Sequence, residues 1–219
     1  MAYTRLISVY SSLSLLGILL FSNPASGSIS VDFKGGVQTV QNPISLQDTT
    51  RSRYEVEFAN SNLVDDHIEV GLSFGGASVS SITDTYTTFD SLGMIQDTFE
   101  DKFRMYDVRL GMRLYPINPI DRMGIHPYVG GGLGYYWLVD SWKDTHLETI
   151  NSPYSEITEE DSGSITLAKG FFPYVTAGME ITVTPQAALL LEYKQDFQKK
   201  EDGVDYGGSI YMVGMRFRW

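Results

Sequence analysis

The sequence contains no cysteine and only three histidines among its 219 residues. Without cysteine, the chain can form no disulfide, offers no thiol nucleophile and carries no cysteine-linked lipid anchor. Basic residues are also scarce, since 16 Lys and Arg stand against 27 Asp and Glu, for a net charge of −11. This balance does not suit the phosphates of nucleic acid, so we expect no nucleic-acid partner.

Long apolar runs are equally rare, and the only substantial one lies at the N-terminus. It covers 6–21, is interrupted by serines and is followed by small residues up to Gly27. The run is shorter than the roughly 20 apolar residues of a membrane helix. We therefore predict a signal peptide over 1–27 rather than a transmembrane helix, followed by a single domain over 28–219.

The last nine residues alternate between two kinds of side chain. The apolar or aromatic positions are Tyr211, Val213, Met215, Phe217 and Trp219. The intervening positions include Gly214, Arg216 and Arg218. A period of two predicts a β-strand with one apolar face. A terminal Trp beside arginines suits a barrel in a membrane, with the ring at the interface and the arginines pointing inward.

Seven earlier segments show the same alternation. They cover 29–40, 53–59, 68–79, 106–115, 128–140, 171–183 and 187–197. Short connections, 60–67, 116–126 and 184–186, alternate with long ones, 41–52, 80–105, 141–170 and 198–207. Alternating short turns and long loops are typical of outer-membrane barrels. We predict an all-β fold, an eight-stranded antiparallel up-and-down transmembrane β-barrel with short periplasmic turns and long extracellular loops.

The two strand faces differ in charge, and this difference indicates which face points inward. One face is almost entirely apolar, whereas the other carries acids, bases and glycines. A soluble, lipocalin-like barrel would turn the apolar face inward around a ligand. In a membrane barrel, an arginine placed on lipid costs about 2–4 kcal/mol near the midplane, and Arg109 and Arg113 lie mid-strand. We therefore expect the apolar face outward, with the soluble ligand-binding barrel as the alternative.

The inward charges should pair with one another, because an isolated buried ion costs several kcal/mol. The predicted lumen ion-pair network consists of Glu55, Glu57, Glu69, Arg109, Arg113, Glu180, Glu192, Arg216 and Arg218. Because the last two strands are neighbours, Glu192 with Arg216 is the first pair we expect. Asp32 and Lys34 of the first strand should also approach Arg216. The network either fills and solvates the interior or gates a narrow, porin-like channel.

Few residues suit catalysis or metal binding. His67 and His126 fall at the short-turn end, and only His146 lies in a long loop, near Ser141. Lipid A-modifying barrels pair a histidine with a nearby serine, and no such strand motif is visible, so we expect no catalytic residue. The acidic residues within 156–161 lack EF-hand spacing. We interpret them as a solvated loop, and we expect neither a metal site nor a cofactor.

The whole of 28–219 resembles the small eight-stranded outer-membrane barrels of the OmpA/OmpX and opacity-protein type. The resemblance is carried by the terminal strand from Tyr211 to Trp219, the glycine-rich stretch 127–134 and Leu189 to Tyr193. It implies an outer-membrane location in a Gram-negative-type bacterium, in contact with lipid and lipopolysaccharide. It also implies folding by periplasmic chaperones and the barrel-assembly machinery, with the terminal strand as assembly signal.

The same resemblance implies roles from adhesion to envelope integrity. We therefore expect a structural or surface-interaction role, with any extracellular ligand bound through the loops 80–105 and 141–170. The alternatives are a narrow porin-like channel, a lipid A-modifying enzyme and the soluble ligand-binding barrel.

Overall fold

The computed structural model describes residues 29–41, 47–65, 67–89, 91, 93–117, 124–151, 154–197, 200–201 and 204–219. The predicted signal peptide, 1–27, lies outside these ranges. Within them, no helix has the length and hydropathy of a membrane span.

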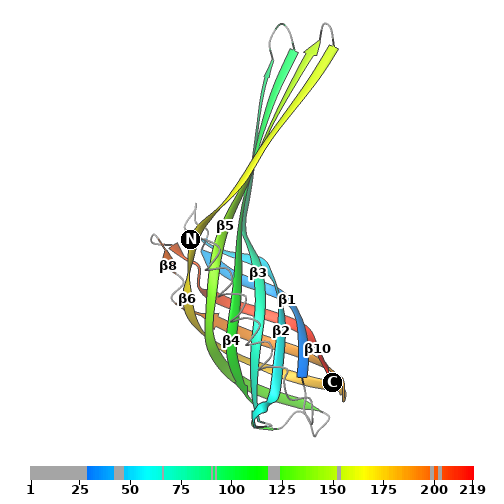
Figure 1. The fold of residues 1–219 in the computed structure, drawn as a ribbon, viewed down its shortest axis with the longest axis vertical. Coiled ribbons are helices and arrows are strands. Elements are labelled where there is room, and N and C mark those ends of the chain that lie inside the picture. The colour runs from blue at the N-terminus through cyan, green and yellow to red at the C-terminus, as the bar shows by residue number, and fades with distance from the viewer. Residues whose placement is uncertain are drawn as a thin grey trace, which may run out of the picture.

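Eight strands close into an antiparallel barrel, as the sequence predicted (Figure 1). They are β1 (Ile29–Gln41), β2 (Asp48–Asp65), β3 (Ile68–Phe89), β4 (Gly93–Leu114), β5 (Ile125–Asn151), β6 (Tyr154–Thr184), β7 (Ala187–Asp196) and β10 (Gly208–Arg218). A separate two-stranded sheet, β8 (Lys200–Glu201) and β9 (Val204–Asp205), lies in the connection between β7 and β10. Each barrel strand pairs with its neighbours in the chain, and β10 closes the ring against β1. This is an up-and-down topology.

The apolar face points outward, and the charged face points into the barrel. Arg109 and Arg216 are fully buried, whereas Phe33 is 53% exposed and Val213 is 61% exposed. An apolar belt of this extent is costly in water and is stable against hydrocarbon. The soluble alternative, with the apolar face turned inward, is therefore wrong.

Two segments predicted as loops are strands instead. Residues 80–89 and 93–105 belong to β3 and β4, and 141–151 and 154–170 belong to β5 and β6. Hydrogen-bonded pairing continues up to Phe89 opposite Met94 and Asn151 opposite Tyr154. Figure 1 shows these four strands extending beyond the barrel as a long twisted sheet. We call 81–89, 93–102, 141–151 and 154–164 the protruding sheet.

The alternation rule missed the protruding sheet because both of its faces meet water. Most side chains of β3 between Ser81 and Phe89 are exposed, and threonine is frequent on this stretch. Threonine has high β-propensity without being apolar. A strand that is wet on both faces therefore shows no apolar–polar period.

Smaller corrections concern the strand ends. Residues 48–52 belong to β2 rather than to a loop, and β2 continues to Asp65 through a register shift that begins after Asn60. The predicted loop 198–207 contains β8 and β9. His126, predicted in a short turn, lies in β5 and is buried.

The barrel interior has an apolar part that the sequence did not predict. At the end next to the protruding sheet, ten buried side chains pack together: Val40, Val79, Phe103, Met105, Tyr136, Leu138, Ala168, Phe172, Tyr174 and Tyr206. Register shifts lie close to Val79 and Leu138. An irregularity of this kind changes which side chains point inward. The predicted polar interior is therefore correct only for the rest of the lumen.

The direction of the two faces can be tested with single spin labels, because the chain has no native cysteine. We predict that labels at Leu110, Met179 and Val213 collide with oxygen dissolved in lipid and are shielded from aqueous relaxants. A label at Thr98 in the protruding sheet serves as the control and should show the reverse. Aqueous accessibility at all three barrel positions would contradict the outward apolar belt.

Candidate functional site

The inward charged side chains form a continuous ion-pair network, with Arg216 at one centre. Its Nε donates to Asp32 at 2.7 Å, and its Nη1 donates to Glu69 at 2.7 Å and to Glu180 at 2.9 Å. Arg218 also donates to Glu180. These contacts join strands β1, β3, β6 and β10 across the barrel.

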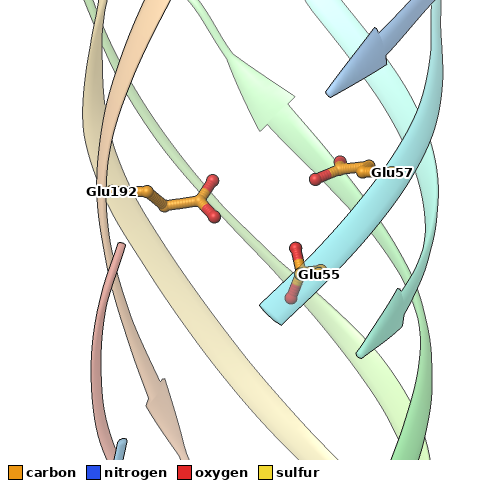
Figure 2. A group of neighbouring side chains, drawn as sticks. All are labelled: Glu55, Glu57 and Glu192. Atoms are coloured by element: carbon orange, nitrogen blue, oxygen red, sulfur yellow. The ribbon is translucent and has the colours of Figure 1, made fainter. Parts of the chain in front are cut away.

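Lys34 is the second centre of the network. Its Nζ lies 2.6 Å from Glu55, 2.5 Å from Glu57 and 2.9 Å from Glu192. Figure 2 shows the three carboxylates converging from β2 and β7. Their oxygens lie within 4.8 Å of one another, a spacing that could hold a metal ion. Because the ammonium of Lys34 contacts all three, it supplies the positive charge that a metal would otherwise provide.

Arg113 connects the two centres. Its guanidinium donates to Glu69 at 2.7 Å on one side, and to Glu57 at 2.5 Å and Glu192 at 2.8 Å on the other. The guanidinium also lies over the ring of Tyr128, 5.1 Å from its centroid. The planar guanidinium of an arginine, with its five N–H donors, suits this bridging position better than the ammonium group of a lysine.

Arg109 joins the charged network to the apolar cluster. It donates to Asp107 at 2.8 Å and to Asp196 at 2.6 Å. Its guanidinium lies 5.1 Å from the ring centroid of Phe172 and 5.3 Å from that of Tyr174. Phe172 and Tyr174 belong to the apolar cluster. The lumen therefore changes from charged to aromatic at this arginine.

All nine residues proposed for the lumen network lie on the inward face and are buried. The expected Glu192–Arg216 ion pair does not occur among the described contacts. The register of β7 and β10 places Glu192 opposite Met212 and Arg216 opposite Ala188. Glu192 binds Lys34, Lys194 and Arg113 instead. Asp32 pairs with Arg216 as expected. Lys34 does not approach Arg216, because it lies at the second centre of the network with Glu57.

Several members of the network are not among the residues predicted from the sequence. They are Arg53, Asp107, Tyr115, Tyr128, Lys194 and Asp196. Arg53, Asp107, Lys194 and Asp196 lie two or four residues from a predicted member of the same strand. Tyr115 follows β4, two residues after Arg113, and Tyr128 is a buried, inward residue of β5. The alternation of inward and outward positions along each strand was therefore a sufficient signal for predicting these residues as members of the network.

The protruding sheet carries its own ion pairs. On one face, a 2.6 Å hydrogen bond joins His146 Nδ1 to Asp97, and this bond raises the pKa of the imidazole above its ordinary value. On the other face, Lys143 donates to Glu160 at 2.8 Å. Ser141, the serine closest to His146 in the predicted loop, lies on the opposite face because the two positions differ in parity. The structure therefore does not bring this serine to the imidazole.

The two edges of the protruding sheet differ in composition. β2 pairs with β3 only as far as Ala77, so 81–89 has β4 as its single neighbour among the described strands. This edge carries one charged residue, Asp84. β7 likewise pairs with β6 only from Tyr174 onward. The β6 edge carries Glu156, Glu159, Glu160 and Asp161.

We predict that Lys34→Met destabilises the barrel by about 3–5 kcal/mol, because three buried carboxylates lose their shared cation. Urea unfolding of the protein refolded in lipid vesicles measures the effect. Added Ca²⁺ should restore part of the loss, since the three carboxylates then form an oxygen site. The matched control is Lys102→Met, whose partly exposed pair with Glu100 is screened by water and should contribute little to stability. Equal effects of the two substitutions would contradict the assigned role of Lys34.

Known proteins match this chain in structure but not in sequence. No protein-family model and no curated protein sequence matches it. Neisserial surface protein A is similar over 89% of this chain and 100% of its own, with a TM-score of 0.53 at 11% identity. The N-terminal β-barrel domain of OprF from Pseudomonas aeruginosa matches with a TM-score of 0.48 at 14% identity, covering 89% of this chain and 100% of that one.

The attachment invasion locus protein Ail of Yersinia pestis gives a TM-score of 0.48 at 14% identity, over 89% of this chain and 99% of its own. At 11% identity, the match to Neisserial surface protein A establishes a common fold and nothing finer. The closed ring of eight antiparallel strands, its outward apolar belt and the match to Neisserial surface protein A lead to one conclusion. The chain has the fold of the small eight-stranded outer-membrane β-barrel proteins.

Proposed function

We propose that this protein is an outer-membrane barrel that binds a partner outside the cell through its protruding sheet. The observation that carries the proposal is the extension of β3, β4, β5 and β6 beyond the barrel as one hydrogen-bonded sheet (Figure 1). Flexible loops would lose conformational entropy when they bind a partner. A paired sheet is already ordered and presents a defined surface.

The β3 edge of the protruding sheet is the part best suited to contact the partner. An edge strand exposes backbone donors and acceptors that can pair with a strand of another protein. Natural sheets usually block such edges with charges, prolines or bulges. The stretch 81–89 has no proline and one acid, whereas four acids stand on the β6 edge. We therefore place strand addition at β3.

The barrel itself acts as a filled anchor in this proposal. The ion-pair network crosses the lumen, and the apolar cluster packs the end next to the protruding sheet. Ion pairs that run across the lumen and aromatic rings that pack at its end leave little room for a hydrated ion to pass. This supports a structural and surface-interaction role over the narrow porin-like channel.

Lysines on the β3 edge should weaken binding to the partner. We predict that Thr83→Lys with Thr87→Lys lowers adhesion of cells displaying the protein by about tenfold, equivalent to about 1.4 kcal/mol. Adhesion to epithelial monolayers and to immobilised matrix proteins is the measurement. The reason is that lysine at an open edge opposes strand addition.

The matched control for adhesion is Thr98→Lys with Thr145→Lys. These residues lie on the same face as Thr83 and Thr87, but on the interior strands β4 and β5. The control should retain adhesion. Equal adhesion of the edge variant and the unchanged protein, or no adhesion above cells lacking the protein, would refute the proposal.

Planar-bilayer recording tests the filled lumen separately. We predict no discrete conductance steps for the intact protein in high-salt solution, and none for Glu192→Gln. The substitution removes one charge from the network but leaves the apolar cluster intact. Steps that appear for the intact protein and change in Glu192→Gln would favour the porin-like alternative.

A further inference from the structure

The free edge of β3 has the composition of a strand that can pair with its own copy. The stretch 81–89 contains threonine, isoleucine, tyrosine and phenylalanine, which have high β-propensity, and its one charged residue is Asp84. Among the described strands, only β4 pairs with this stretch. The N–H and C=O groups on its other side are those that an added strand binds. A second copy of the same stretch supplies such a strand.

Antiparallel pairing about Thr85 suits both copies. A two-fold axis relates the two strands, so that when residue i of one copy faces residue j, residue j also faces residue i. With Thr85 opposite its own copy, Thr83 lies opposite Thr87. On the other face of the sheet, Asp84 lies opposite Tyr86. Threonine pairs across two strands stabilise a sheet, and no acid lies opposite an acid.

The length of the free edge also fits this register. Pairing about Thr85 places Phe89 of one copy opposite Ser81 of the other, so the paired stretch spans about 30 Å. β3 has β2 as a neighbour only as far as Ala77. Phe89 of the second copy therefore ends short of the residues that pair with β2.

The other edge of the protruding sheet does not suit self-pairing. An axis through the middle of 154–164, at Glu159, would place that glutamate opposite its own copy. Moving the axis by one residue gives the same result at Glu160, or places Glu156 opposite Glu160 around Thr158. Like charges directly opposite each other destabilise a sheet. Self-pairing is therefore favoured at β3 and opposed at β6.

The antiparallel direction decides how the two copies are arranged. β3 runs from the barrel at Ile68 to the far end of the protruding sheet at Phe89 (Figure 1). In an antiparallel pair, β3 of the second copy runs the opposite way along the same edge. Its barrel therefore lies beyond the far end of the first sheet, in a membrane that faces the first one. Two copies in one membrane could pair these strands only in the parallel direction.

We propose that β3 of one copy adds to β3 of a second copy across two facing membranes. The two protruding sheets then form one continuous antiparallel sheet, with Thr85 on the two-fold axis. This inference rests on the proposed function in one respect, because both require an open β3 edge. It names a second copy of this chain as a partner, so that cells carrying the protein adhere to one another.

Clustering of lipid vesicles tests the contact between two copies without any other partner. The intact protein is inserted into phosphatidylcholine vesicles, and clustering is followed by light scattering. We expect vesicles that carry the protein to cluster with one another, whereas labelled vesicles without protein stay outside the clusters. Absence of clustering would overturn the proposal.

A charge exchange at Thr85 tests the register. Thr85→Lys places an ammonium opposite its own copy, and Thr85→Asp places a carboxylate there, so each variant alone should lose clustering. Vesicles of one variant mixed with vesicles of the other should cluster again, because the facing charges are then opposite in sign. The matched control is Thr145→Lys, on the same face but on the interior strand β5, which should cluster like the unchanged protein.

Heat-modifiable gel mobility verifies that each variant has folded. Clustering of Thr85→Lys alone, or no recovery in the mixture, would refute the pairing about Thr85. Adhesion to epithelial monolayers or matrix proteins without vesicle clustering would remove only the contact between two copies. Vesicle clustering without such adhesion would remove only the proposed function, so the two failures are distinguishable.

Discussion

The structure depends on the mutual neutralisation of charges that the closed barrel removes from water. Each inward arginine or carboxylate would cost several kcal/mol if left alone. Arg216, Arg113 and Lys34 each contact at least three carboxylates, which come from at least two other strands in every case. The contacts that cross the lumen, such as Arg113 with Glu192, and those across the β1–β10 seam, such as Arg216 with Asp32, exist only when the ring of strands is closed. Closure, strand register and charge pairing are therefore one cooperative condition.

A buried ion-pair network is weak evidence for net stability, because apolar packing of equal volume often performs as well. Its stronger effect is on specificity. Shifting any one strand by a single residue would turn its charges toward hydrocarbon and its apolar residues toward the lumen. The apolar cluster specifies the register less strongly, because apolar packing does not require particular partners. It fills the end of the lumen next to the protruding sheet, and Arg109 joins the two regions through carboxylates on one side and aromatic rings on the other.

The outer parts of the molecule follow from the solvent that each one meets. The belt around Val213 and Leu110 is apolar because lipid surrounds it. The protruding sheet is rich in threonine and charged residues because water reaches both faces. On β7 the outward positions change from Leu191 through Tyr193 to Gln195, and the ring of Tyr193 packs against that of Tyr211 at this change from apolar to polar.

Alternation along the chain determined the barrel strands, their inward and outward faces and nine members of the lumen network, because a side chain's face depends only on the parity of its position. Parity is unchanged by a slip of two residues, so it could not assign partners. The Glu192–Arg216 expectation failed for this reason, and the convergence of Glu55, Glu57 and Glu192 on Lys34 was not visible. The protruding sheet also escaped detection, since strands that are wet on both sides have no apolar period. Only closure of the barrel decided which charges meet across the axis and where the lumen becomes apolar, because both depend on register and strand tilt rather than on sequence spacing.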